Sequence, residues 1–548
     1  MDRRKFFKKS GVVLSGLALS GSVLSGCFEE KKPVVGKVTS GEKFPIDASK
    51  LKYYWGDLHN HCNLTYGHGD LDKAYEAARE QLDFVSVTPH AMWPDIPGKG
   101  DPRLEWVIEY HESAFRRLRA GGWDRYTKMN EKFNSKDFIT FLSYECHSMQ
   151  HGDHVVLNYD MDAPLVECTS VEDLKDKLKD TKTFITPHHM GYQEGYRGYN
   201  WDFFSEGRQT PFVEMYSRHG LAESDLGDYP YLHDMGPRHW EGTIMYGLNQ
   251  GHKFGIMGST DQHAGYPGSY GDGRVGVLAE GLDRDSLWNA LENRKTCCVT
   301  GDRILIDFRI NDATIGDITR GNQRRIYLNV QGESAIDYVD IVKNGRTVGR
   351  ISGPLTPQNP EGDVVRAKVK FEFGWNRFEE AVKWNGDIKI SDGVIHNISP
   401  CFRGAPFVSP QEGVKEAPTL INKIINQNEK GCELEMFTTK NPNTTSPATQ
   451  AVILDVTMPK KGKFTLNFNG QTFKYSLAEL LEGTKTQFMN GWLSEAIQFH
   501  RAIPHDAFEF EHFMLDETPE QETDYYYVRV RQRDNQWGWS SPIWVERV

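Results

Sequence analysis

The stretch FGIMGSTDQH, residues 254–263, joins a short apolar run to two side chains that can bind metal. Residues 254–258 predict a buried strand, and Asp261 and His263 follow it directly. In parallel α/β barrels the carboxyl ends of the strands assemble the active site. The stretch therefore predicts an α/β protein whose functional residues follow its strands.

Other predicted strand ends carry the same kinds of side chain. In GDLHNH, residues 56–61, His59 and His61 lie two apart, so an extended backbone points both rings to one face. Strands predicted over 83–88, 138–143 and 183–186 are followed by His90, Glu145 and His188, respectively. Of the 19 histidines, 15 fall between His59 and His263. A metal site in this part of the chain is therefore expected.

The periodicity of the chain changes near residue 302. From residue 51 to 302, apolar runs alternate with helical patterns over 71–81, 171–179 and 285–294, which predicts an α/β domain. From 303 to 548, alternating apolar and polar runs are separated by Asn-Gly and Gly-rich turns. That pattern predicts a β-rich, sandwich-like second domain.

The first 27 residues have the character of a targeting signal rather than of a folded segment. Arg3 and Arg4 resemble a twin-arginine export signal, and Leu24-Ser-Gly-Cys27 resembles a lipobox whose cysteine receives lipid. Residues 28–50 are polar and predict a tether. We expect an exported lipoprotein, periplasmic or at the cell surface, held to the membrane only through Cys27; the alternative is an uncleaved membrane anchor.

Charge and cysteine spacing exclude several classes of site. The net charge is −12, and removal of the basic signal makes the mature part more acidic, which argues against a nucleic-acid partner. The eight cysteines form no CxxC pair, so neither a zinc ribbon nor a regular disulfide framework is predicted. An isolated disulfide remains open. The sequence predicts no oligomeric state.

Taken together and in order, the ligand-capable residues and several longer stretches resemble the PHP (polymerase and histidinol phosphatase) superfamily. The stretches are GDLHNH, VEMYSRHG, FGIMGSTDQHAGYPGSYGDG and the final YYYVRVRQRDNQWGWSSPIWV, which resemble an exported branch with a C-terminal β domain. The resemblance implies a distorted (β/α)7 PHP-type barrel over 51–302, followed by the β-rich domain over 303–548. It also implies two or three divalent metal ions, for which nitrogen and oxygen ligands suit zinc, manganese or iron.

The resemblance implies a role for each ligand in turn. His59, His61 and Asp261 would bind the first metal; Glu145 would bridge to a second, completed by His154 and His188; and His90, His263 and His68 would hold a third. This chain has Thr88 where many PHP proteins have aspartate, and His68 lies one residue further from His59 than expected. His189 could replace His188. His147, His151 and His219 are open between a direct role and a supporting or surface one.

The expected reaction is metal-dependent hydrolysis of a small phosphoester, with monoesters or diesters favoured and triesters possible. Arg218, after the predicted strand 212–216, is the candidate for binding a substrate oxyanion, or else closes a structural salt bridge. Asp57 is the candidate for orienting a ligand imidazole.

Two other functions remain open. One is hydrolysis of non-phosphate substrates, because a fold does not determine a reaction. The other is a surface binding protein with a structural metal centre, in which Trp537 and Trp539 would be exposed to bind glycan rather than packed in the β domain.

Overall fold

The computed structural model describes residues 50–98, 100–229, 235–355, 359–406, 419–441 and 447–548. The expected signal, the lipid site at Cys27 and the tether up to residue 49 lie outside these ranges. None of the helices within them is both long and apolar enough to cross a membrane.

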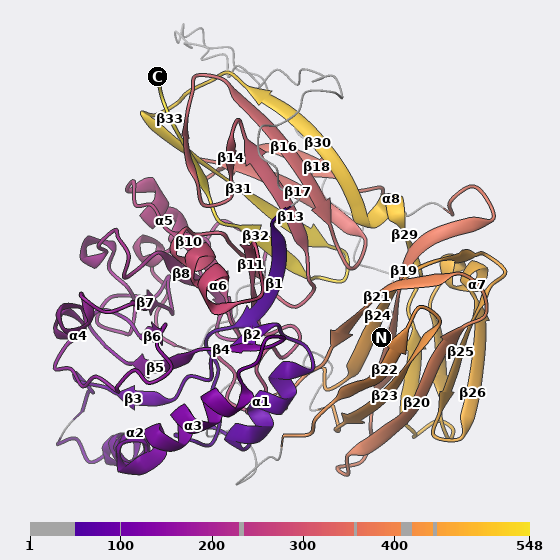
Figure 1. Cartoon of the computed structure of the whole chain (residues 1–548), viewed down its shortest axis with the longest axis horizontal. Coiled ribbons are helices and arrows are strands. Elements are labelled where there is room, and N and C mark those ends of the chain that lie inside the picture. Colours follow the sequence, from indigo (N-terminus) through magenta and orange to yellow (C-terminus); the bar gives the residue numbers. More distant parts are fainter. Residues whose placement is uncertain (1–49, 99, 230–234, 356–358, 407–418, 442–446) are drawn as a thin grey trace, which may run out of the picture.

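The expected (β/α)7 barrel is wrong. Of the described residues, 40% lie in strands and 16% in helices, and no closed barrel occurs among them. The strands that carry the candidate ligands divide among three sheets (Figure 1). These are β1 (Lys52–Asp57), β2 (Phe84–Val85) and β4 (Ile139–Thr140); β3 (His90–Met92), β5 (Leu142–Cys146), β6 (His154–Asn158) and β7 (Thr183–Pro187); and β8 (Phe212–Ser217), β9 (Gly220–Leu221) and β10 (Gly255–Gly258).

Strand direction explains why no barrel closes. The pairs β1·β2, β2·β4, β3·β5 and β8·β10 are parallel, but β5·β6 and β6·β7 are antiparallel. Only residues 147–153 link β5 to β6, and a parallel crossover needs a dozen residues or more. The chain therefore turns back at this point instead of adding a β/α unit.

Helices cover the outside of this half of the molecule. Three of them overlap the predicted helical stretches: α1 (Leu71–Arg79), α4 (Val171–Leu178) and α6 (Arg284–Glu292). The others are α2 (Glu105–Arg117), α3 (Trp123–Phe133) and the short α5 (Ile244–Asn249). Figure 1 shows α1, α2 and α3 along the lower side of this half, with α1 nearest the orange sandwich; Ala77 of α1 packs against the sandwich core.

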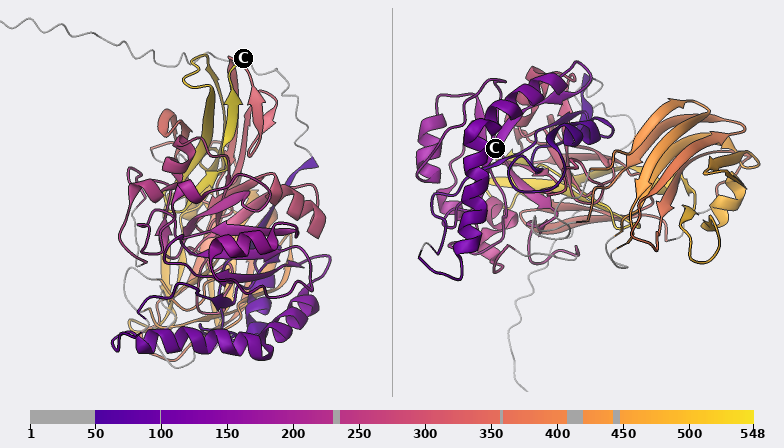
Figure 2. Two further views of the ribbon diagram at one scale, coloured as in Figure 1. Left: turned by 90° about the vertical axis from the view of Figure 1, so that its left-hand side faces the viewer. Right: turned by 90° about the horizontal axis from the view of Figure 1, so that it is seen from below.

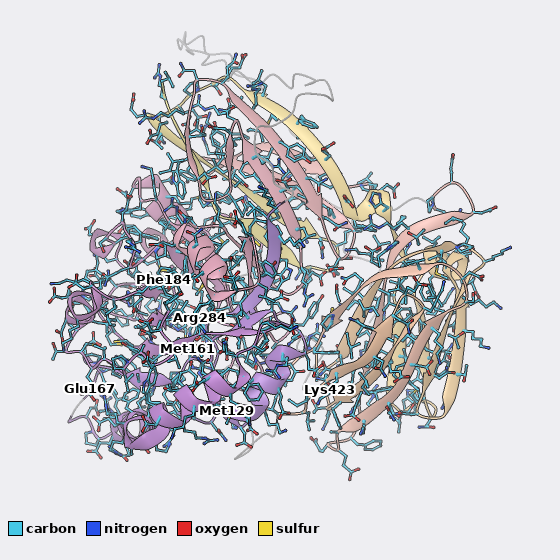
Figure 3. All side chains as sticks on the ribbon, viewed as in Figure 1. Met129, Met161, Glu167, Phe184, Arg284 and Lys423 are labelled. Carbon is cyan, nitrogen blue, oxygen red and sulfur yellow. The ribbon has the colours of Figure 1, made fainter. Side chains whose placement is uncertain are left out.

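Helix α6 illustrates how a helix packs here. The Asp283 side chain accepts a hydrogen bond from the Ser286 backbone N–H and begins the helix. Trp288 then stacks on Phe184 of β7, with ring centroids 3.9 Å apart. Arg284 donates to the carbonyls of Thr140 (2.7 Å) and Tyr159 (3.0 Å). Figure 3 labels Phe184 beside this helix and Arg284 in its first turn.

The largest sheet joins strands from both ends of the chain. Strand β12 (Thr296–Val299) pairs with β32 (Trp537–Ser540), so that Cys297 lies opposite Ser540. The sheet order is β15-β33-β31-β32-β12-β11-β1-β2-β4, with β17 and β18 attached through β31. The remaining bounds are β11 (Arg274–Ala279), β15 (Ile318–Arg320), β17 (Ile336–Lys343), β18 (Arg346–Ser352), β31 (Thr523–Gln532) and β33 (Ile543–Glu546). Residues 302 and 303 thus fall between strands that contribute to one continuous sheet.

Besides their strands in the largest sheet, residues after 303 form two further β units. One is a small sheet, β14-β13-β16-β30, whose buried side faces the largest sheet. Its strands are β13 (Leu305–Ile310), β14 (Ala313–Thr314), β16 (Arg324–Gln331) and β30 (Glu509–Asp516), the last preceded by α8 (His505–Phe508). In β16, buried positions alternate with more exposed ones, as expected of a strand with one covered face.

The other is a separate two-sheet sandwich over residues 364–504, drawn in orange in Figures 1 and 2. The first sheet is β21-β24-β19-β28-β27, with β29 attached, and the second is β22-β23-β20-β25-β26. The bounds are β19 (Val364–Gly374), β20 (Val382–Ile390), β21 (Val394–Cys401), β22 (Lys423–Asn428), β23 (Gly431–Thr438), β24 (Gln450–Pro459), β25 (Lys463–Phe468), β26 (Gln471–Ser476), α7 (Leu477–Glu482), β27 (Lys485–Phe488), β28 (Ala496–Phe499) and β29 (Ile503–Pro504). A single core of apolar side chains fills the space between the two sheets.

Trp537 and Trp539 are fully buried between the largest sheet and the ligand-bearing half. Their rings stack on each other at 5.8 Å, and Trp539 donates to Glu223 at 3.0 Å. They are packing residues, so they offer no exposed aromatic surface for a glycan.

The sandwich gives a testable dependence of stability on pH through Glu372 of β19. Burial alone would raise the pKa of Glu372, but the hydrogen bond from His500 (2.7 Å) and the charge of Lys370 outweigh it and hold the pKa well below its usual value. The ionised side chain therefore stabilises the fold above its unfolded-state pKa of 4.5, and this contribution is lost as pH falls below that value. Glu372→Gln is expected to lower the free energy of unfolding by about 1.5–3 kcal/mol near pH 7, the scale of a hydrogen bond to a charged group.

Melting curves from pH 7 down to pH 3 measure this effect. The gap between the variant and the parent chain should narrow below about pH 4.5. Glu433→Gln, on the exposed face of β23, is the matched control and should change little at any pH. A gap for Glu372→Gln that stays constant across this range contradicts the prediction.

Candidate metal centre

The segment after β1 brings two imidazoles together, with their rings nearly perpendicular. His59 and His61 are buried, and their Nε2 atoms lie 3.2 Å apart. His61 Nδ1 contacts the carbonyl of Thr88 at 2.6 Å, and His59 Nδ1 contacts Glu214 Oε2 at 2.8 Å. When both Nδ1 atoms donate a proton, both Nε2 lone pairs face the same point, which is the tautomer that metal-binding histidines adopt.

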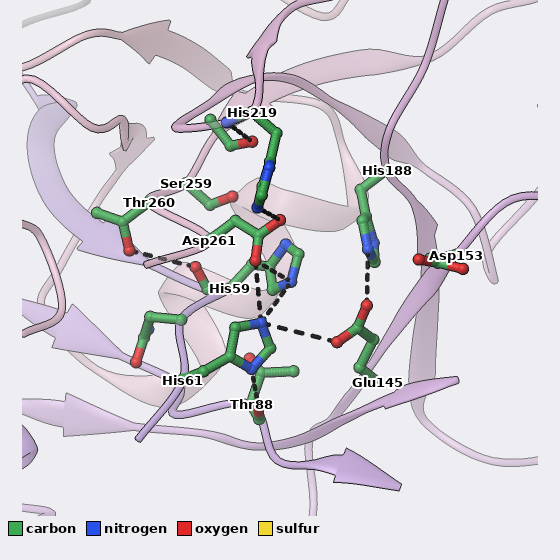
Figure 4. A network of polar contacts seen from close by, with 12 residues as sticks. His59, His61, Thr88, Glu145, Asp153, His188, His219, Ser259, Thr260 and Asp261 are labelled. Atoms are coloured by element: carbon green, nitrogen blue, oxygen red, sulfur yellow. Dashed lines mark hydrogen bonds and ion pairs between the residues drawn. The ribbon is translucent and has the colours of Figure 1, made fainter. Parts of the chain in front are cut away.

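Asp261, in the loop after β10, completes this arrangement (Figure 4). Its Oδ1 lies 3.0 Å from His61 Nε2 and 3.4 Å from His59 Nε2. Its Oδ2 faces His219 Nε2 at 3.3 Å. Asp261 has a φ of 45°, in the left-handed region, and its backbone N–H donates to the carbonyl of His59 at 2.8 Å. Strained backbone of this kind concentrates at functional sites.

Glu145, near the end of β5, lies between two groups of histidines. Its Oε1 is 3.0 Å from His188 Nε2, and its Oε2 is 3.3 Å from His90 Nε2 and 3.7 Å from His61 Nε2. Figure 4 shows Glu145 between His61 and His188. Glu145 Oε2 is fully buried and has no hydrogen-bond partner in the described part of the chain. A buried carboxylate oxygen without a donor is costly unless a cation satisfies it.

Asp153, just before β6, anchors the opposite side of the cluster. His147 Nδ1 lies 3.0 Å from Asp153 Oδ2, and Arg197 Nε donates to the same oxygen at 2.9 Å. Asp153, Glu145, His188 and His189 form one group of possible ligands. Their ligand atoms lie within 4.8 Å of one another. His189, like Asp261, has a left-handed φ, of 55°.

The electric field of the cluster favours a cation. Burial disfavours protonation of His59, yet the carboxylates of Asp261 and Glu214 outweigh it and raise the pKa of His59 to about 10. For His90 and His263, burial instead lowers the pKa well below its usual value, so both rings are neutral and keep a lone pair for coordination. The same field that holds a proton on His59 would hold a metal ion in its place.

These residues fit a metal centre. Convergent imidazole Nε2 atoms, carboxylates without enough donors and the absence of thiolate among the groups suit zinc, manganese or iron. The buried groups are His59–His61–Asp261; Glu145–Asp153–His188–His189; His61–His90–His263; His90–Glu145–His147; and His219–Asp261–His263.

The structure brings together all the predicted ligands except two. His154 Nδ1 contacts the carbonyl of Gly152 at 2.9 Å, and His154 belongs to none of the groups found among the described residues. His68 likewise belongs to none of them, although its backbone N–H donates to the carbonyl of His263 at 2.7 Å. His151, whose role the sequence left open, instead contacts Glu172 at 2.7 Å and stacks on Phe203.

Arg218 and Asp57 lie beside the cluster and support its loops. Arg218 Nη1 pairs with Asp272 Oδ1 at 2.7 Å, and Gln262, next to Asp261, donates to the other oxygen of Asp272 at 3.1 Å. This is the geometry of a structural salt bridge. Asp57 accepts hydrogen bonds from Thr260 Oγ1 (2.6 Å) and from the backbone N–H of Gly268 (2.8 Å). It thus holds the loop that carries Asp261, and its contact with His59 is to the backbone N–H, at 3.2 Å.

Three functional candidates were missed from sequence: Glu214, Asp153 and Arg197. Glu214 occupies a fully buried position in β8 and orients the His59 ring. A lone carboxylate inside an apolar strand, VEMY, was the available signal. For Asp153 the signal was its place beside His154 at a strand start. Arg197 offered no signal, since it comes from an irregular loop with a φ of 66°.

Comparison with known proteins adds little beyond this geometry. No family model matches the chain. The chain is 27% identical over 154 residues to an uncharacterized protein of Chlamydia muridarum, and 26% identical over 165 residues to one of Chlamydia trachomatis. These matches cover 25% and 27% of this chain and 25% and 26% of the relatives, so the chain spans about a quarter of their length.

One solved structure is similar over much of the chain. It is a two-domain protein of Bacteroides vulgatus containing a predicted PHP-like metal-dependent phosphoesterase. The match covers 78% of this chain and 95% of that one, at 12% identity and a TM-score of 0.30. A TM-score this low carries no argument about fold or activity, so function has to be inferred from the site itself.

Proposed function

We propose that the chain is a metal-dependent hydrolase of small phosphoesters. One observation carries this proposal: two buried ligand groups, His59–His61–Asp261 and Glu145–Asp153–His188–His189, lie side by side and are joined by the contact of His61 with Glu145. A closed structural site uses four ligands around one ion. The larger set here suits adjacent ions, which is the arrangement of many phosphoesterases.

The residues of the chain have separate tasks in this proposal. His59, His61 and Asp261 would hold one ion, and Glu145, Asp153, His188 and His189 a second; His90 and His263 are the candidates for a third. When bound, such ions would supply an activated water and stabilise negative charge on phosphoryl oxygens. Glu214 and Thr88 keep the His59 and His61 rings in the required tautomer.

Two features lie beside the cluster. A cavity of about 10 Å³, room for about one water molecule, is lined by His189, Glu214 and His219, among others. His147 Nε2 contacts the hydroxyl of Tyr66 at 2.7 Å, while its Nδ1 is held by Asp153. That pairing gives His147 a fixed orientation and a hydroxyl that can exchange a proton with it.

A substrate panel tests the reaction. The full chain, loaded separately with zinc, manganese or iron, is assayed on nitrophenyl phosphate mono-, di- and triesters, with sulfate and carboxylate esters alongside. We expect metal-dependent turnover of a phosphate ester and competitive inhibition by inorganic phosphate. Turnover of carboxylate esters alone would overturn the phosphoesterase assignment, and no metal-dependent turnover of any ester would overturn the hydrolase assignment.

Location is a second part of the proposal. The sequence of residues 1–27 supports export and lipid attachment at Cys27. Cell fractionation should place the protein in the membrane fraction, and Cys27→Ala should leave an unlipidated precursor. An intact precursor in the cytoplasm would contradict this placement.

A further inference from the structure

Two cysteine sulfurs are in contact beside the metal centre. Cys146, the last residue of β5, directly follows the candidate ligand Glu145. Cys168 lies in the segment between β6 and α4. Their Sγ atoms are 3.6 Å apart, and Cys168 Sγ lies 3.3 Å from Met92 Sδ of β3. Both cysteines belong to, or pack against, one apolar core.

The two thiols differ in access to solvent. Cys146 is fully buried, whereas Cys168 is half-buried. The contact with Cys146 lowers the pKa of Cys168, which favours its thiolate. A reagent in solution can therefore reach Cys168, and Cys146 is placed to react next.

We propose that Cys146 and Cys168 are a modification site that forms a disulfide by exchange with a disulfide oxidant. The Cys168 thiolate attacks the oxidant, forming a mixed disulfide and releasing one oxidant thiol. Cys146 Sγ then attacks Cys168 Sγ, and its proton passes to the departing oxidant sulfur, which forms the internal bond and releases the second oxidant thiol. Two protein thiols are oxidised, one oxidant disulfide is reduced to two thiols, and the two protein protons pass to those thiols.

The two sulfurs are close but not bonded. A disulfide bond is about 2.05 Å long, so the sulfurs, 3.6 Å apart, must approach by about 1.5 Å. Cys297 and Cys298 cannot bridge in the same way, because neighbours in a strand point to opposite faces. All seven cysteines in the described ranges are unbridged in this structure.

The bond would close a loop that carries part of the metal centre. Residues 147–167, between the two cysteines, contain His147 and Asp153. Glu145 directly precedes Cys146. Bridging therefore restrains three side chains of the cluster at once. This effect rests on the proposed metal centre: the chain with the disulfide is expected to lose metal to a chelator more slowly than the reduced chain.

Peptide mapping tests the bond directly. The native full chain, fully reduced and then equilibrated with oxidised glutathione, is alkylated and digested with a protease that cleaves at acidic residues, because residues 147–167 contain no Lys or Arg. We expect one peptide pair linked through Cys146 and Cys168, with a mass about 2 Da below the sum of the reduced peptides. Alkylated Cys146 and Cys168 after this treatment, or glutathione held stably on Cys168, would overturn the proposal.

Matched variants keep the test specific. Cys168→Ser should abolish the linked pair, while Cys432→Ser, in the distant sandwich, should leave it unchanged. The time course of zinc extraction by EDTA then compares oxidised and reduced parent chain with Cys168→Ser. A linked pair with identical extraction rates would overturn the restraint on the metal centre but not the bond, and a chain that binds no zinc would instead count against the proposed function.

Discussion

Replacing Asp261 with asparagine is expected to remove bound metal and to lower the rate of hydrolysis by on the order of 10³-fold, about 4 kcal/mol of barrier. Asp261 Oδ1 faces both His59 and His61, and its Oδ2 faces His219, so one side chain contributes to two of the ligand groups. An amide of the same size leaves packing intact but removes the negative charge that a cation needs.

Elemental analysis of the purified variant measures the loss, and assays with and without added metal separate binding from chemistry. Asp272→Asn is the matched control, because Asp272 lies in the same loop region but pairs with Arg218 instead of with the cluster. Asp261→Asn with full metal content and full activity would contradict the assignment of this residue as a ligand.

The second large effect is expected at Arg197. Its guanidinium contacts Asp153 through Nε and Nη2 and lies 3.1 Å from His147 Nδ1. Asp153 is fully buried, so Arg197→Ala would remove the cation beside its carboxylate and leave only the contacts with His147 Nδ1 and the Ser148 backbone N–H. Removing one partner of a buried pair costs about 3–5 kcal/mol. We expect a loss of that size in the unfolding free energy of the metal-free chain, partly restored by zinc, which would neutralise Asp153 and stabilise the folded state.

Denaturant unfolding in EDTA measures the loss of unfolding free energy without metal, and the same experiment in zinc measures how much of it is restored. Arg218→Ala is the comparison, since Asp272 is partly exposed at 13% and keeps its hydrogen bond from Gln262. The loss there should be about 1 kcal/mol or less, the scale of partly exposed pairs. Arg197→Lys retains a charge and should recover part of the loss. Equal effects at Arg197 and Arg218 would contradict this distinction.

The local features of the fold were largely predictable from sequence. The apolar run before Asp261 forms β10, and the helical patterns at 71–81 and 171–179 form α1 and α4. These features depend on neighbours along the chain, which the sequence states directly. The β-rich character after residue 303 was likewise predictable from its alternating pattern.

Pairing between strands was not predictable, and this is why the barrel was wrong. Whether β5 pairs parallel or antiparallel with its neighbour depends on the short 147–153 link, which was not recognised as a turn between strands. The partner of β12 is β32, far away in sequence. The alternation of apolar residues says which face of a strand is buried but not which strand lies beside it.

In the candidate site, too, the residues that follow strands were predictable, and those brought in by contacts distant in sequence were not. His59, His61, His188 and Asp261 follow strands, so position along the chain identified them. Glu214 acts only because β8 lies next to the His59 segment, a contact across 155 positions. Arg197 reaches Asp153 from an irregular loop, which no periodicity reports.

The pairing of β12 with β32 also has a consequence for how the protein is made. The ribosome synthesises residues 296–299 long before residues 537–540, so β12 waits as an unpaired edge while more than two hundred further residues are added. The metal-bearing half cannot complete its main sheet during translation. Its open edge must be protected until residues 537–540 have been synthesised, and a premature stop between residues 299 and 537 leaves that edge open to pairing with other chains.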